Sequence, residues 1–341
     1  MSTQPQPDLL SEVLGSVKLD TAFYFNAEFS APWTVHTPHS CRIAPYLAPN
    51  AEHLIIFHML VAGRMYARLE SGERLMLEPG DIVTFPHGDA HVLGNGPETL
   101  RIEASETLSH VLNRGLEMAR FGSGGEATRV VCGFMALDPR LCGTILGGLP
   151  PMLKVSLRQD PSGHWLENSI LFSVTQAGAA DAGSRAVLAR LSETLFIETI
   201  RRYIQQLPDG ETGWLAGTRD PVVGQALAVL HRNPGNAWTI ASLAQEVGIS
   251  RSVLADRFKN LLGEAPMAYL TRLRLQLGAK MLTTTRRSVA EIASDAGYES
   301  EASFNRAFKR EFGLPPARFR NEALLSRGRA TGTVQSAGAG G

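Results

Sequence analysis

Three histidines and one cysteine in the first half of the chain are the side chains best suited to bind a metal ion or to transfer a proton. They are His58, His87, His91 and Cys132. Imidazole and thiolate groups are frequent ligands of divalent transition metals, so a divalent metal is a candidate cofactor. Two other roles remain open for the same residues: hydrogen-bonded residues of a protein core, and contacts to a small effector molecule.

Cysteine chemistry offers a second kind of signal. Cys132 and Cys142 flank the turn-forming pair Asp138-Pro139, which could bring two segments together and allow a redox-switched disulfide. The alternative is that both are small buried hydrophobic residues, the commoner role of a free cysteine. With Cys41 the chain has 3 cysteines, an odd and sparse set that fits a reducing compartment.

The histidines lie in a stretch that is typical of β-structure. Between residues 54 and 92, short runs rich in β-branched and aromatic residues alternate with glycine and proline turns, which predicts an antiparallel barrel or sandwich. Residues 80–95 contain the spacing G-x5-P-x-G-x2-H-x3-N. This spacing resembles the second motif of the cupin family and implies a cupin barrel over residues 34–160, after a lead segment of residues 1–33.

The cupin resemblance also bears on catalysis. The first cupin motif should supply H-x-H followed by a glutamate, which would complete a metal site with His91. Here His58 is followed by Leu60, and no glutamate stands at the expected distance. Because metal-dependent oxygenases and isomerases need a metal held by protein ligands with open positions, we do not expect an enzyme.

The second half of the chain contains an internal repeat. The sequence IASLAQEVG at residues 240–248 matches VAEIASDAG at residues 289–297, and further matches follow in each copy. Each copy predicts a short helix, a turn at a glycine and a second helix that ends at another glycine, which is typical of a helix-turn-helix unit. Paired αα-hairpins in a helical bundle are the alternative, but two copies on a basic background favour DNA binding.

Turn and cap residues recur at matching places in the two copies. Gly248 and Gly297 stand where the backbone is expected to need a positive φ, and Ser250 and Ser300 are expected to be helix N-caps. Residues 266–283 predict a connecting helix, which would hold the two units at a fixed separation suited to successive major grooves on one face of DNA.

Residues 220–320 resemble the DNA-binding domain of the AraC/XylS family of bacterial transcription regulators, and the run GYESEASFNRAFKREFGLPPARFR carries much of that resemblance. The resemblance implies a DNA-binding domain over residues 213–325, with helix-turn-helix units at about 221–263 and 285–313. We expect residues 326–341, which are small and glycine-rich, to be a disordered tail.

The resemblance places one recognition helix in each unit. The candidates for base contacts are Arg251, Ser252, Ala255, Asp256, Glu301, Ala302, Asn305 and Arg306. Arg306 suits guanine, Asn305 suits adenine, and an acidic side chain such as Asp256 or Glu301 could accept from a cytosine amino group. The candidates for phosphate contacts, or alternatively for a solvated basic face, are Arg257, Lys259, Lys309, Arg310 and Arg318. Phe258 and Phe308 are expected in the core.

The charge distribution agrees with a division of the chain into two functions. The formal net charge is zero, from 33 basic and 33 acidic side chains. Residues 1–212 carry a net charge of −7 and residues 213–341 carry +7, so the neutrality is a cancellation. The basic half is suited to phosphate contacts, whereas the acidic half is repelled by DNA.

Two helices are predicted between the halves, at residues 165–174 and 186–205. The second helix carries a broad apolar stripe, which must be buried either on the barrel of the same chain or in a dimer interface. The family resemblance favours a homodimer formed through the region 161–212, before the chain breaks at Pro208-Asp209-Gly210.

Together these patterns predict a multidomain protein with an N-terminal all-β cupin barrel with flanking helices and a C-terminal all-α double helix-turn-helix domain. We expect a sequence-specific transcription regulator, more often an activator than a repressor, whose cupin domain senses a small effector, a metal or a redox signal. Its partners would be double-stranded promoter DNA, a second copy and, for an activator, RNA polymerase. No stretch is apolar enough for a membrane span, and we expect a cytoplasmic protein that is nucleoid-associated when bound to DNA.

Two alternatives come from other classes of protein. One is a metal-dependent cupin enzyme with an auxiliary DNA-binding domain, and the other is a DNA-bending protein that needs no ligand.

Overall fold

The computed structural model divides the chain into two compact units. Its described residues are 10, 19–48, 51, 53–97, 101–103, 116–122, 124–137, 146–177 and 183–322. The described residues of Lys18–Pro139 and Leu149–Gln206 form the barrel unit, and those of Leu207–Gly341 form the helical unit. Cys142 and the predicted tail at residues 326–341 lie outside the described residues.

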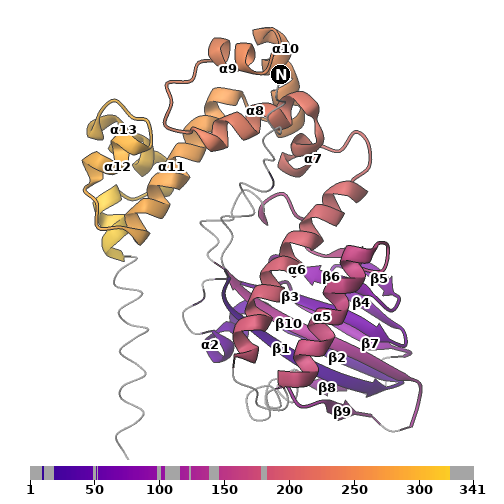
Figure 1. The fold of residues 1–341 in the computed structure, drawn as a ribbon. Coiled ribbons are helices and arrows are strands. Elements are labelled where there is room, and N and C mark those ends of the chain that lie inside the picture. Colours follow the sequence, from indigo (N-terminus) through magenta and orange to yellow (C-terminus); the bar gives the residue numbers. More distant parts are fainter. Residues whose placement is uncertain are drawn as a thin grey trace, which may run out of the picture. The chain divides into compact units, whose positions relative to one another are not determined.

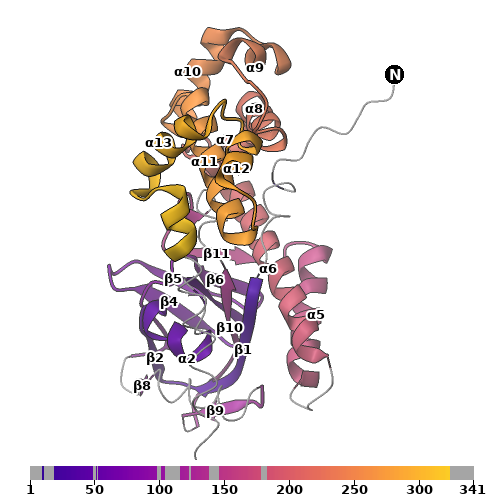
Figure 2. The same ribbon diagram turned by 90° about the vertical axis from the view of Figure 1, so that its left-hand side faces the viewer.

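The strands of the barrel unit form two sheets (Figures 1 and 2). In chain order they are β1 (Leu19–Ser30), β2 (Trp33–Thr37), β3 (His53–Ala62), β4 (Met65–Leu69), β5 (Arg74–Leu77), β6 (Asp81–Phe85), β7 (His91–Asn95), β8 (Arg101–Glu103), β9 (Ala119–Phe121), β10 (Ala127–Leu137) and β11 (Leu153–Ser156). One sheet has the order β11-β6-β3-β10-β1-β9 and the other has the order β5-β4-β7-β2-β8. The short helices η1 (Ser40–Arg42) and α2 (Ala44–Leu47) connect β2 to β3.

The core of the barrel unit lies between the two sheets. Alternate residues of each strand point to one face, and Phe25, Ala27 and Phe29 of β1 share one buried cluster with Trp33 and Val35 of β2. The predicted all-β fold with flanking helices is therefore confirmed for the N-terminal part of the chain.

The structure corrects the expected start of the barrel at residue 34. Strand β1 begins at Leu19, pairs with β10 along its length and also pairs with β9, so it lies inside the six-stranded sheet. Only residues 25–30 of β1 alternate aromatic or small residues with polar ones, because residues 23–25 are three consecutive aromatic residues; this irregular pattern did not predict a strand before the recognisable turns.

Two long helices belong to the barrel unit: one packs against β1 and β11 of the six-stranded sheet, and the other packs against the first (Figures 1 and 2). The helix on the sheet is α6 (Ser184–Gln206), and its neighbour is α5 (Pro161–Ala177). In the apolar stripe of α6, Leu188, Leu195, Ile200 and Ile204 are buried, and the hydroxyl of Tyr24 on β1 lies 2.6 Å from Ser192 Oγ. Of the two expected locations for the stripe, the structure thus shows packing on the same chain.

The helical unit consists of two groups of helices joined by one long helix (Figure 1). The bounds are α7 (Trp214–Arg219), α8 (Pro221–Arg232), α9 (Ile240–Glu246), α10 (Arg251–Leu262), α11 (Pro266–Thr284), α12 (Val289–Asp295) and α13 (Glu301–Phe312), and residues 316–322 are also helical. Helix α11 contacts α10 of the first repeat copy and both α12 and α13 of the second copy. The predicted all-α fold of this part is confirmed.

The local signals predicted for the two repeats are confirmed. Gly248 and Gly297 have φ angles of 72° and 78°, which suit glycine because a Cβ is disfavoured there. Ser250 and Ser300 cap α10 and α13, and each side chain accepts a hydrogen bond from the backbone N–H three residues later. Each cap satisfies a backbone donor that the helix itself leaves unpaired, so the start of each second helix is fixed locally.

None of the described helices is both long enough and apolar enough to cross a membrane.

Candidate functional site

Helix α13 combines a buried face with a basic exposed face. Phe304 and Phe308 are completely buried and hold the helix against α11 and α12. Of the predicted base-contacting residues, Glu301, Ala302 and Arg306 are exposed and Asn305 is half-buried. The predicted phosphate-contacting residues Lys309 and Arg310 are also exposed. The packing thus leaves one side of the helix free to enter a major groove.

Helix α10 has the same arrangement with a different set of side chains. Leu254 and Phe258 are completely buried, which confirms the expected place of Phe258, as α13 does for Phe308. The predicted base-contacting residues Arg251, Ser252 and Asp256 are exposed, and Ala255 is half-buried. This helix therefore presents an exposed carboxylate where α13 presents the guanidinium of Arg306.

The five predicted phosphate contacts fall into two groups. Lys259, Lys309 and Arg310 are exposed, and none makes a side-chain hydrogen bond or ion pair with another described residue. Arg257 instead pairs with Asp220, the N-cap of α8, at 3.1 Å. Arg318 pairs with Glu322 at 2.9 Å. A phosphate would therefore compete with a carboxylate for these two arginines, and their role in phosphate binding stays a prediction.

Inside the barrel, three of the four candidate sensor residues form one hydrogen-bonded chain. Cys132 on β10 lies opposite His58 on β3 in the strand register, and the Sγ atom is 2.8 Å from Nδ1 of that histidine. Nε2 of His58 lies 2.8 Å from Nε2 of His91 on β7. Nδ1 of His91 lies 2.8 Å from the backbone oxygen of Asp89. All three side chains are at most 5% exposed.

The direction of each hydrogen bond in this chain follows from its last member. The carbonyl oxygen of Asp89 can only accept, so Nδ1 of His91 donates. Burial lowers the pKa of His91 to about 4 and that of His58 well below its usual value, so both rings are neutral near pH 7. Nε2 of His91 must then accept from His58, and Nδ1 of His58 must accept from the thiol of Cys132.

The thiol is consequently held in its protonated form. Burial raises the pKa of Cys132, and the neutral ring of His58 provides an acceptor for its proton. Phe85 stacks on His91 with ring centroids 3.6 Å apart and an angle of 6° between the rings. This aromatic residue was not among the predicted site residues, because nothing in its local sequence indicates that β6 places it against β7.

The donor geometry does not fit a metal site that uses all the predicted ligands. Cys132 and His91 contact opposite nitrogens of His58, so no single ion can be coordinated by all three. His87 does not join them, since its Nε2 lies 3.0 Å from the backbone oxygen of Leu149. Among the described residues, no cluster of three or more histidine, cysteine or acidic residues could hold a metal ion. Cys142, the other redox candidate, lies outside those residues.

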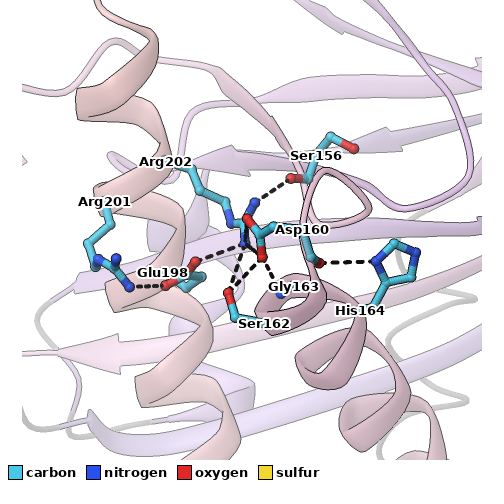
Figure 3. Close-up of polar contacts among 8 residues, drawn as sticks. All are labelled: Ser156, Asp160, Ser162, Gly163, His164, Glu198, Arg201 and Arg202. Carbon is cyan, nitrogen blue, oxygen red and sulfur yellow. Dashed lines mark hydrogen bonds and ion pairs between the residues drawn. The ribbon is translucent and has the colours of Figure 1, made fainter.

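A buried arginine near the end of α6 forms a second polar cluster that sequence reasoning missed (Figure 3). Arg202 is 4% exposed. Its guanidinium donates to Asp160 at 2.9 Å, to the Ser156 carbonyl at 3.1 Å and to Ser162 Oγ at 3.4 Å, and it pairs with Glu198 at 2.9 Å. The hydrogen bond from Arg202 is the largest cause that holds the pKa of Asp160 well below its usual range. This cluster, the Arg202 cluster, fastens α6 to the end of β11 and to the start of α5.

Comparison with known proteins connects both regions to one family. Residues 8–205 match a family model described as Cupin, and residues 243–322 match one described as Helix-turn-helix domain. A putative AraC-like transcription regulator from Streptomyces lividans is 32% identical over 81% of this chain and 90% of its own length. The chain belongs to the AraC-like transcription regulators.

This AraC-like regulator has further relatives of comparable length. The RCS-specific HTH-type transcriptional activator RclR of Escherichia coli is 31% identical over 78% of this chain and 84% of its own. The HTH-type transcriptional regulator AlkR of Acinetobacter baylyi is 28% identical over 93% of this chain and 100% of its own. The solved DNA-binding domain of AdpA in complex with a target DNA is 28% identical, covers 32% of this chain and 96% of that domain, and has a TM-score of 0.31.

The AraC-like regulator is thus a DNA-binding transcription regulator with an N-terminal cupin domain, as the sequence predicted. The barrel unit contains the cupin domain and the helical unit contains the DNA-binding domain.

Proposed function

We propose that the cupin domain of this regulator senses a small chemical signal through Cys132, His58 and His91, and that the signal changes transcription from a bound promoter. The observation that carries the proposal is the hydrogen-bonded chain from the thiol to the Asp89 carbonyl. The three side chains of this hydrogen-bonded chain are buried beside the apolar cluster of the barrel. Buried polar groups are costly unless each is paired, so any loss of one member disturbs the others.

The thiol end of the chain is the member that a signal can change. An oxidant or electrophile reacts with the thiolate, so it modifies Cys132 only in the fraction of molecules in which this buried thiol becomes accessible and loses its proton. Such a modification, or a ligand that displaces the hydrogen bond of the thiol, removes the donor to Nδ1 of His58. That nitrogen is then an unpaired acceptor inside the core, which costs about 1 to 3 kcal/mol. A change of this size is enough to shift the balance between two conformations of a domain. The arrangement therefore favours a thiol-reactive or small-ligand signal over a metal coordinated by all three residues.

An activating output is part of the proposal. The relative RclR is described as an RCS-specific HTH-type transcriptional activator, and this description supports an activating output for the present regulator. Activation would bring RNA polymerase as a partner at the promoter.

We further propose that the regulator is a homodimer, and that α5 provides the contact surface. Trp165 and Phe172 are 61% and 66% exposed and lie seven residues apart, on one face of this helix. Glu167 is the only charged residue of α5, and it is buried against Arg158. An exposed aromatic face without charge can pair with a copy of itself without like-charge repulsion. The apolar stripe of α6 is already used within the chain, so α5 replaces it as the expected contact.

The sensor proposal is tested by transcription from a target promoter with the purified full-length chain, before and after treatment with hydrogen peroxide. Cys132→Ser keeps a hydrogen-bond donor to His58 but removes the reactive sulfur, so the response should disappear while basal output remains. Cys41→Ser is the matched control because Cys41 is an exposed free cysteine, and it should respond as the unmodified chain does. An identical response from the Cys132 variant would show that the signal acts elsewhere.

A further inference from the structure

One large hydrophobic side chain of the DNA-binding domain is exposed. Among the described residues of the helical unit, Val253 is the only large hydrophobic side chain that is exposed, at 48%. The core next to it is filled by Leu254 and Phe258, which are completely buried. The cap at Ser250 uses only the backbone N–H of Val253, so any residue type could serve there.

Valine is an unfavourable choice for this position on two separate grounds. A β-branched side chain loses χ1 freedom in a helix, and it has a lower helix propensity than alanine or the long polar residues that usually cover helix surfaces. Exposure of its two methyl groups to water adds a hydrophobic cost. Neither cost is compensated within the described part of this unit, so the side chain is available to a partner.

The position of Val253 on α10 indicates what that partner is. It lies in the first turn of the recognition helix, and in helix-turn-helix proteins the N-terminal residues of that helix contact base edges. Residues three and four positions apart are neighbours on a helix surface. Val253 is therefore next to Asp256, a predicted base-contacting residue, and next to Arg257 on the other side.

We propose that Val253 is a specificity-determining residue that packs against the C5-methyl group of a thymine in the half-site contacted by α10. Thymine is the only base that presents an apolar group in the major groove, and small apolar side chains are its usual partners. Contact with this methyl group removes both apolar surfaces from water. The inference rests on the DNA-binding domain alone and is independent of the sensor proposal.

The second recognition helix lacks this feature. Ser303 occupies the equivalent position on α13, is half-buried, and directs its hydroxyl back to the Ser300 carbonyl at 2.7 Å. The two half-sites should therefore differ. The half-site contacted by α10 should contain a thymine whose methyl group contributes to binding, whereas Ser303 should require no thymine methyl group in the half-site contacted by α13.

The test uses duplexes that the full-length chain selects from a randomised DNA pool. Each thymine of a selected site is replaced in turn by deoxyuridine, which removes only the methyl group, and the Kd is measured for each duplex. For the unmodified chain, one thymine in the α10 half-site should show a Kd increase of roughly fourfold, the value expected for loss of one buried methyl. With Val253→Ala, which is favourable in a helix and should fold normally, the same replacement should change the Kd little.

Val187→Ala serves as a matched control, because Val187 is 51% exposed and lies on α6 of the other unit. It should keep the fourfold difference between thymine and deoxyuridine. Val253→Thr keeps one methyl group and should give an intermediate difference. The proposal is overturned if no thymine of the α10 half-site depends on its methyl group, or if the dependence survives in Val253→Ala.

Discussion

Arg306 and Lys309 lie three residues apart on the exposed side of α13, yet their chemistry suits different parts of DNA. The planar guanidinium of Arg306 can donate two hydrogen bonds to O6 and N7 of guanine, whereas the ammonium of Lys309 acts as a point charge near phosphates. Both are exposed. The division between specificity and affinity can therefore be tested with one substitution at each position.

Arg306→Ala should weaken binding to the selected site by about 1 to 3 kcal/mol and relax the preference at one base pair. Lys309→Ala should instead weaken selected and random DNA alike, and reduce the slope of log K against log salt by about 0.9. Binding curves on both DNAs over a range of salt concentrations separate the two effects. Equal losses on selected and random DNA for Arg306→Ala would contradict its assignment to a base.

The buried histidines predict how the stability of the cupin domain depends on pH. Burial lowers the pKa of His91 to about 4, compared with about 6.5 in an unfolded chain. Between these values the unfolded state binds the proton and the folded state does not, so stability falls as the pH falls from 6.5 towards 4. At pH 5 the cost from His91 is about 2 kcal/mol relative to neutral pH.

His91→Gln should reduce this pH dependence, because the amide oxygen of glutamine can accept from His58 without titrating. The measurement is urea unfolding of the full-length chain at pH 7 and pH 5, followed by a signal from the cupin domain. An unchanged difference between the two pH values in the variant would mean that His91 is protonated in the folded state as readily as in the unfolded state.

At the scale of elements, what could be predicted from sequence depends on how far apart the interacting residues lie in the chain. Ser250 and Ser300 cap helices that begin at the next residue, and Gly248 and Gly297 adopt the φ that the turn requires. Such signals are local and are repeated, so the helix-turn-helix units could be predicted. Family resemblance supplied the assignment of individual residues to bases.

The cupin site was predicted only in part, because strand pairing decides it. His58 and Cys132 are 74 positions apart, and only the register of β3 against β10 brings them opposite each other. The sequence identified these residue types but left open whether they bind a metal or one another. One partner of Arg202, Glu198, lies four positions earlier on the same helix, but the others, up to 46 positions away, had no local signal.

The Arg202 cluster makes a prediction for the attachment of α6. Arg202→Met removes a buried cation that pairs with Asp160 and Glu198 and donates to the Ser156 carbonyl. It should lower the free energy of unfolding of the cupin domain by about 3 kcal/mol, the lower end of the cost of breaking a buried ion pair. Arg201→Met is the matched control, since Arg201 is 53% exposed and, within the described part of the chain, forms an ion pair with Glu198 alone. Its effect should stay within about 0.5 kcal/mol. Chemical denaturation of both variants measures the two losses of unfolding free energy. Equal losses would mean that the Arg202 cluster contributes no more to stability than the ion pair of Arg201.

At the scale of the whole molecule, the opposite charges of the two parts of the chain become important. The net charge of zero is the sum of −7 over residues 1–212 and +7 over residues 213–341. The DNA-binding domain attracts the phosphate backbone, while the cupin part is repelled by it. The repulsion of the acidic part should weaken binding to random DNA and leave the base contacts unchanged. Salt screens the repulsion between separated charges, whereas direct contacts to the bases remain as the salt concentration rises.

The repulsion predicts a salt-dependent difference between the full-length chain and a fragment of residues 207–341. On random DNA, the ratio of the Kd of the full chain to that of the fragment should fall between about 0.01 M and about 0.15 M salt, as the Debye length shortens from about 30 Å to about 8 Å. Neutralising the exposed acidic residues Glu70, Glu73 and Glu78 by substitution with glutamine should move the full chain towards the fragment at low salt. A ratio that stays constant over this range would mean that the acidic part has no electrostatic effect on DNA binding, and that the charge division serves solubility or folding instead.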